Sequence, residues 1–167
     1  PGISWSRTRK RNQTFPSWGD GQQLTLEWSD PAWGSDARFV RTTFDSQWVR
    51  MLGSENRFVG RIGGGAMATN AFDKVPPSLR FFAGGDQSIR GYSYESLSPE
   101  NEDGELLGGQ HMLTSSIEYQ RHLTGNFWSA TFVDTGNAFD EWWPDELKTG
   151  AGVGVRSAAA PEHQGVV

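Results

Sequence analysis

Residues 38–52, RFVRTTFDSQWVRML, alternate in character along the chain. On one face of an extended backbone lie Val40, Thr42, Phe44, Ser46 and Trp48. The other face carries Arg41, Thr43, Asp45 and Gln47. Because successive side chains of a β-strand point to opposite faces, this period of two predicts a strand with one mainly apolar and one polar face.

The same alternation recurs on both sides of this stretch. In residues 22–29, leucine and tryptophan alternate with glutamine, threonine and glutamate. We predict seven strands, at Trp5–Arg11 and at residues 22–29, 38–52, 57–68, 110–121, 127–137 and 148–156. No segment repeats every 3.6 residues, so almost no helix is expected. Short turns are predicted at Gly19–Asp20–Gly21 and Ser54–Glu55–Asn56, and a long connection at residues 70–108.

Composition narrows the class of protein. Hydrophobic residues make up 35% of the 167, below the roughly 45–50% of soluble domains. The 8 Trp and 10 Phe argue against a disordered chain. Low hydropathy with many aromatics and 21 Gly fits a transmembrane β-barrel, in which half of each strand faces water. The alternation alone leaves a soluble β-sandwich open.

Several other classes are excluded or disfavoured. The net charge of −5 argues against a nucleic-acid partner. The absence of Cys excludes disulfides and thiolate metal sites. His111, His122 and His163 lack metal-ligand spacing, and no nucleophile motif or phosphate-binding loop is present. We therefore expect no metal, no cofactor and no enzymatic activity. No run of about 18 apolar residues is present, so no transmembrane helix is expected. No signal peptide is present and the chain opens at Pro1, so if the protein is secreted, this sequence is expected to be an internal piece of it.

Tryptophans lie close to the ends of the predicted strands. In transmembrane barrels, Trp and Tyr gather at the two membrane interfaces, with short turns at one rim and longer loops at the other. We expect these girdles to include Trp18, Trp28, Trp33, Trp48, Trp128, Trp142 and Trp143.

The long connection contains an unusual run, PPSLRFFAGGDQSIRGYSY at residues 76–94. Gly84 and Gly85 permit positive φ or a close backbone approach. Ile89, Arg90, Gly91 and Tyr92 follow four residues later. A mobile external loop is one interpretation. The other is a loop folded into the barrel lumen, with Arg90 held by carboxylates of the wall.

The predicted wall contains two such carboxylates. Glu118 lies on the polar face of its strand, and Asp134 lies in the run FVDTG. A carboxylate facing lipid is unfavourable, so Asp134 should point inward together with Phe132. Arginine suits this position because its planar guanidinium pairs with a carboxylate through two hydrogen bonds.

The run RFFAGGDQSIRGYSY, followed by GGQHMLTSSIEYQ, FVDTGNAF and KTGAGVGVR, resembles the bacterial surface antigen family of outer-membrane assembly barrels. The likeness covers about residues 1–156, and PGISWSRTR and FDKVPPSLRFFAGGD make it greatest to the TamA-like members. The resemblance implies a barrel of about sixteen antiparallel strands in the outer membrane of a Gram-negative bacterium, preceded by periplasmic domains. It also implies that Arg90 contacts Asp134 and Glu118 in the lumen, with the matched motifs completed by Gly84, Gly85, Ile89, Gly91, Tyr92, Phe132 and Gly136.

The resemblance implies a function as well. TamA-like proteins insert autotransporters and other outer-membrane proteins into the lipid bilayer, together with an inner-membrane-anchored TamB-like partner, and are implicated in envelope lipid transport. A passive outer-membrane pore and a two-partner secretion transporter remain alternatives. Since seven strands are counted, we expect residues 1–156 to form a partial barrel domain that is inactive alone. Residues 157–167 show no alternation and are expected to be disordered.

Overall fold

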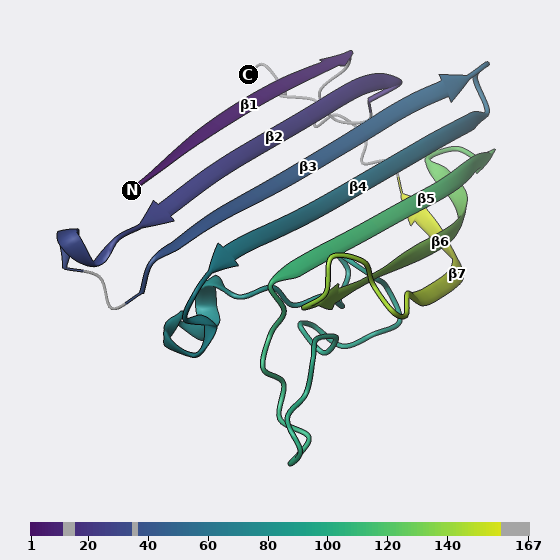
Figure 1. The fold of residues 1–167 in the computed structure, drawn as a ribbon. Coiled ribbons are helices and arrows are strands. Elements are labelled where there is room, and N and C mark those ends of the chain that lie inside the picture. Colours follow the sequence, from purple (N-terminus) through teal and green to yellow (C-terminus); the bar gives the residue numbers. More distant parts are fainter. Residues whose placement is uncertain (12–15, 35–36, 158–167) are drawn as a thin grey trace, which may run out of the picture.

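A computed structural model describes residues 1–11, 16–34 and 37–157 (Figure 1). One antiparallel sheet holds seven strands in chain order: β1 (Gly2–Arg11), β2 (Trp18–Ser29), β3 (Phe39–Leu52), β4 (Asn56–Thr69), β5 (His111–Thr124), β6 (Phe127–Phe139) and β7 (Lys148–Ser157). Single 3₁₀ turns lie in the connections, at η1 (Pro31–Trp33), η2 (Phe72–Lys74) and η3 (Pro77–Leu79). No helix in these ranges is long and apolar enough to cross a bilayer.

The predicted fold class and all seven strands are confirmed, with boundaries that move by a few residues. Within the described ranges the sheet is open, with β1 and β7 as its edges. The turn predicted at Gly19–Asp20–Gly21 is wrong, because these residues belong to β2 and pair with Thr8–Lys10 of β1. Asp20 accepts a hydrogen bond from Arg9 Nε at 3.2 Å, a cross-strand pair that supports the extended conformation. The predicted tail lies outside the described residues except for Ser157, which ends β7.

The two faces of the sheet differ as a membrane barrel requires. Large apolar side chains are exposed on the convex face, among them Phe44, Ile117 and Val133. Polar side chains are buried on the other face, including Glu118 and Asp134. A soluble sandwich would bury the apolar face instead. This inverted pattern fits a wall with lipid outside and a polar lumen inside.

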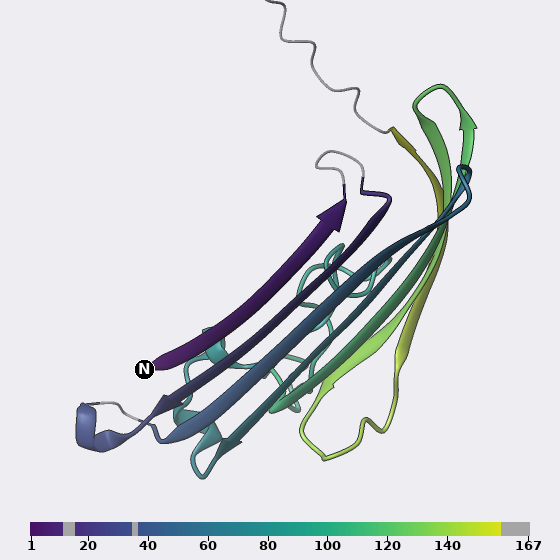
Figure 2. The same cartoon turned by 90° about the horizontal axis from the view of Figure 1, so that it is seen from above.

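The β4–β5 connection lies along the concave face of the curved sheet (Figure 2). Its start packs in an apolar cluster of Ala37, Phe39, Met67, Val75, Phe81 and Ala138. Phe81 lies against Gly65 of β4, where an added Cβ would come within 2.2 Å of the ring. Backbone bridges Phe81–Gly109 and Ala83–Leu97 join distant parts of the connection to each other. The long loop is therefore ordered against the wall.

The connections define two rims. Residues 53–55 and 125–126 join strands at one end, hereafter the short-turn rim, whereas the connections at 30–38, 70–110 and 140–147 form the long-loop rim. This asymmetry is the predicted one.

The tryptophans occupy different positions relative to these rims. Trp18 and Trp48 face outward near the short-turn rim, and Trp28 faces outward near the long-loop rim. The prediction that Trp128 belongs to an interfacial girdle is wrong. Trp128 is buried on the inward face, which it shares with Asp134, and its ring packs against His122 with the ring centroids 5.0 Å apart. Trp142 and Trp143 are exposed in the β6–β7 connection, and the side chain of Trp33 lies outside the described part.

Candidate functional site

Arg90 is carried into the lumen by a compact turn at the tip of the β4–β5 loop. Gly84 and Gly85 adopt φ of +107° and +96°, a region that side chains disfavour. Ser88 closes this turn, because its N–H donates to Gly85 O at 3.0 Å and its Oγ accepts from Gly84 N–H at 3.2 Å. Gly91, with φ of +95°, turns the chain away again after Arg90. The glycines of the motif thus set the loop geometry and do not themselves bind the wall.

The guanidinium of Arg90 forms a fork with Asp134 of β6. Arg90 Nε donates to Asp134 Oδ2 at 2.7 Å and Nη2 donates to Oδ1 at 2.8 Å. The backbone N–H of Arg90 adds a third hydrogen bond to Oδ2 at 2.9 Å. The Asp134 side chain is fully buried, so these charge-assisted bonds replace the water it would otherwise require.

Two side chains of β5 complete the contacts of the guanidinium. Arg90 Nη1 donates to Glu118 Oε2, and Nη2 donates to Ser116 Oγ at 3.1 Å. Hydrogen bonds to Asp134 and then Glu118 raise the pKa of Arg90 above its usual value, although burial opposes the shift. Arg90 therefore stays charged and joins the loop to both β5 and β6.

An aromatic ring and two glycines of the sheet lie beneath Arg90. The guanidinium carbon is 3.5 Å from the centroid of the Phe132 ring, a cation–π contact. Gly152 of β7 leaves room for that ring, because an added Cβ would lie 2.6 Å from it. Gly150 leaves room for the loop backbone, because its Cβ would lie 2.0 Å from the carbonyl oxygen of Arg90. Gly136 similarly lets β6 approach β5, since its Cβ would lie 2.3 Å from Leu113 O.

The network extends past Arg90 toward the short-turn rim. Arg156 of β7 donates from Nε and Nη2 to Glu118 at 2.6 and 2.9 Å. Gln120 also donates to Glu118, and Arg57 Nη1 of β4 donates to Gln120 Oε1 at 2.6 Å. Glu118 accepts hydrogen bonds from Arg90, Gln120 and Arg156, and Asp134 accepts three from Arg90. The arrangement therefore holds the loop on the inner surface of the sheet.

The structure brings together Arg90, Glu118, Phe132 and Asp134, the four predicted residues whose side chains form the contact. Ile89 is fully buried beside them. Tyr92 lies at the margin, where its hydroxyl donates to Thr149 O at 3.5 Å. Sequence reasoning missed the parts played by Arg57, Ser116, Gln120, Gly150, Gly152 and Arg156. The alternation pattern could have identified two of them, because Ser116 and Gln120 lie two residues on either side of Glu118 and therefore share its face.

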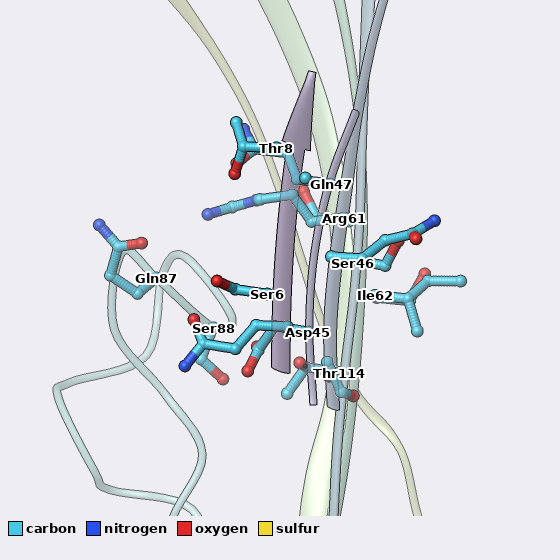
Figure 3. A pocket seen from close by; sticks show the side chains of 16 residues that line it. Ser6, Thr8, Asp45, Ser46, Gln47, Arg61, Ile62, Gln87, Ser88 and Thr114 are labelled. Atoms are coloured by element: carbon cyan, nitrogen blue, oxygen red, sulfur yellow. Dashed lines mark hydrogen bonds between the residues drawn. The ribbon is translucent and has the colours of Figure 1, made fainter. Parts of the chain in front are cut away.

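Beyond Arg90 the loop tip faces the other half of the sheet across a polar pocket of about 300 Å³. Figure 3 shows Gln87 and Ser88 of the loop on one side, with Ser6 and Thr8 of β1 and Arg61 of β4 on the other. The loop contacts β5 and β6 and also borders a pocket with β1. It therefore lies within the concave side of the sheet.

Comparisons with known proteins agree with this architecture. A model of the Omp85 superfamily domain matches residues 2–161. The outer membrane protein assembly factor BamA of Nitratidesulfovibrio vulgaris is 33% identical over 161 residues, which is 92% of this chain and 20% of that protein. The sorting and assembly machinery component 50 homolog of Mus musculus is 37% identical over 79 residues, 46% of this chain and 16% of that protein.

A solved structure shows the same fold. The crystal structure of BamA from Haemophilus ducreyi lacking POTRA domains 1–3 superimposes with a TM-score of 0.79 and 19% identity, over 95% of this chain and 36% of that one. The chain thus spans about a fifth of the BamA relative and about a third of the solved chain.

Proposed function

This chain belongs to the Omp85 superfamily of outer-membrane β-barrels, and from that premise we propose that it forms part of a factor that assembles other outer-membrane proteins. Its location is the outer membrane of a Gram-negative bacterium. The observation that carries the proposal is the Arg90 cluster, which holds a long loop on the concave face through hydrogen bonds to strands β5 and β6. A passive pore would use such a loop only as a constriction, and its conductance would not respond to a client protein.

The proposed mechanism makes and breaks no covalent bond. An unpaired strand edge offers its N–H and C=O groups to an incoming client strand, which adds by β-augmentation. The Arg90 cluster keeps β5, β6 and the loop in one arrangement, so that the wall behind such an edge stays rigid. An isolated sheet with two unpaired edges is unfavourable in a bilayer, and we therefore propose that this chain acts only as part of a closed barrel.

We further propose that the protein is TamA-like, acting with a TamB-like inner-membrane-anchored partner on autotransporters and in envelope lipid transport. What supports this finer assignment is the sequence of PGISWSRTR at residues 1–9 and FDKVPPSLRFFAGGD at residues 72–86. Co-purification of such a partner from solubilised envelopes is the expected result. Recovery of outer-membrane lipoproteins alone, with no inner-membrane-anchored protein, would instead favour a BamA-like assignment.

The test of the assembly function is Arg90→Ala in the complete barrel protein that contains this chain, reconstituted in liposomes, with a client β-barrel added unfolded. Assembly is followed by the heat-resistant electrophoretic mobility of the folded client. We expect the initial rate to fall at least about tenfold, since loss of about 1.4 kcal/mol of positioning already gives that factor. Arg38→Ala is the matched control, because Arg38 is an exposed arginine paired with Asp30 at the long-loop rim.

A client assembly rate equal to that of the unmodified protein, with the Arg90→Ala barrel itself folded, would contradict the proposal. Steady ion conductance that is unchanged by client addition would favour a passive pore instead.

A further inference from the structure

Guanidinium groups gather on the convex face at the short-turn rim. Arg7, Arg9 and Arg11 occupy alternate positions on that face of β1, and Arg50 lies on the same face of β3. All four are exposed. The chain has a net charge of −5, yet this patch sets four guanidinium groups against one carboxylate, Asp20, which pairs with Arg9 at 3.2 Å. We call these four arginines with Trp18 the rim patch.

Trp18 organises the rim patch. Its ring lies between Arg9 and Arg50, whose guanidinium carbons are 5.7 and 5.0 Å from the ring centroid. Arg50 is fixed further, since its Nη1 donates to Gly19 O at 2.7 Å and to Val49 O at 2.8 Å. In the described part of the chain, Arg7, Arg11 and Arg50 form no ion pair with a carboxylate. Within these residues, no carboxylate neutralises the charge of these three arginines.

The place of the rim patch along the strands indicates how deep it lies relative to the membrane. Arg11 ends β1, Trp18 begins β2, and Arg50 lies two residues before the end of β3. Farther from this rim the same face becomes apolar, with Leu24 and Phe44 directly opposite one another. Aromatic side chains mark the boundary between hydrocarbon and headgroups in membrane proteins. The guanidinium groups thus stand where the phosphates of the adjoining leaflet lie.

We propose that the rim patch binds the phosphodiester of an anionic glycerophospholipid in the leaflet that meets the short-turn rim. The ligand is a lipid headgroup because the patch adjoins the apolar band that would hold its acyl chains. Arginine binds phosphate through paired N–H donors, and a polybasic patch at the membrane surface favours anionic lipids. This site is distinct from the lumenal Arg90 cluster, and it neither requires nor repeats the proposed assembly function.

The test measures lipid selectivity of the protein in detergent micelles by native mass spectrometry, with phosphatidylglycerol and phosphatidylcholine titrated in competition. The unmodified protein should bind phosphatidylglycerol preferentially. Arg11→Gln with Arg50→Gln should lower that preference about 25-fold, from about fivefold for each surface arginine. The paired lysine variants, R11K with R50K, should keep most of it, and Arg38→Gln at the opposite rim should change nothing.

Three results would overturn the proposal. One is an unchanged preference in the double glutamine variant. Another is an equal loss in Arg38→Gln, which would show that total charge alone matters. The third is displacement of the lipid by millimolar inorganic phosphate, which would identify a site for free anions. If the glutamine variant does not fold, the unmodified protein provides the test, because its preference must fall as salt rises from 50 to 500 mM, a range over which exposed charges become strongly screened.

Discussion

Replacing Gly150 by alanine adds one methyl group where the loop lies on the wall. The new Cβ would lie 2.0 Å from the carbonyl oxygen of Arg90, so the loop must move by more than about 1 Å to restore an ordinary contact. The hydrogen bonds from Arg90 to Asp134 measure 2.7 to 2.9 Å and do not survive such a displacement intact. The expected cost to loop docking is about 1–3 kcal/mol, the usual range for overpacking.

The assay uses a single buried reporter. The described chain has no cysteine, and Ile89 is fully buried in the docked loop, so Ile89→Cys reacts with a thiol reagent only when the loop opens. Adding Gly150→Ala should raise the labelling rate about 5- to 150-fold, the factor that corresponds to 1–3 kcal/mol. Gly154→Ala is the matched control on the same face of β7, because its Cβ would meet nothing within 4 Å. Equal labelling rates in the two alanine variants would show that the contact at Gly150 does not control loop docking.

Two further substitutions test the parts of the network that sequence reasoning missed. Arg156→Gln should lower the free energy of unfolding by at most about 1 kcal/mol, measured by heat or urea, because Arg156 is half exposed and Glu118 keeps its other donors. A loss above about 3 kcal/mol would show that Arg156 is the main partner of Glu118. Gly65→Ala should lower the stability of the loop base by about 1–3 kcal/mol, because the added Cβ would lie 2.2 Å from the buried Phe81 ring. Gly64→Ala is the control, because its Cβ would make only an ordinary contact and should have little effect. Equal effects of the two substitutions would contradict the packing of Phe81 on Gly65.

Strand positions followed from the sequence because each strand has one face in contact with lipid and one with the lumen. That arrangement imposes a period of two on hydrophobicity, as in residues 38–52, and it fixes which face each side chain takes. The same rule placed Glu118 inward, whereas Asp134 was placed inward because a carboxylate facing lipid is unfavourable. The Gly19–Asp20–Gly21 prediction failed because turn propensity is local, whereas the pair of Asp20 with Arg9 depends on a neighbouring strand.

The site was only partly accessible to the same reasoning. Ionic partners of Arg90 could be predicted from charge and face, but the wall glycines could not. Gly150 and Gly152 matter because of what lies above them, a loop carbonyl and the Phe132 ring, and this proximity is set by tertiary packing. Trp128 shows the converse, since an aromatic near a strand end was expected at the membrane interface and instead packs on the lumen side against His122.

Arg90 docks the β4–β5 loop on the concave face of the sheet. Cysteines at Ser88 and Thr114, which line the same lumenal pocket, test this docking with a short bifunctional thiol reagent in the membrane-embedded protein. The negative control pairs Ser88 with Thr135, whose side chain faces outward and meets Thr149 on the convex face. We expect efficient cross-linking of Ser88 to Thr114, loss of this cross-link on adding Arg90→Ala, and no cross-link to Thr135. Free labelling of both thiols without cross-linking, or cross-linking that is indifferent to Arg90→Ala, would contradict this docking.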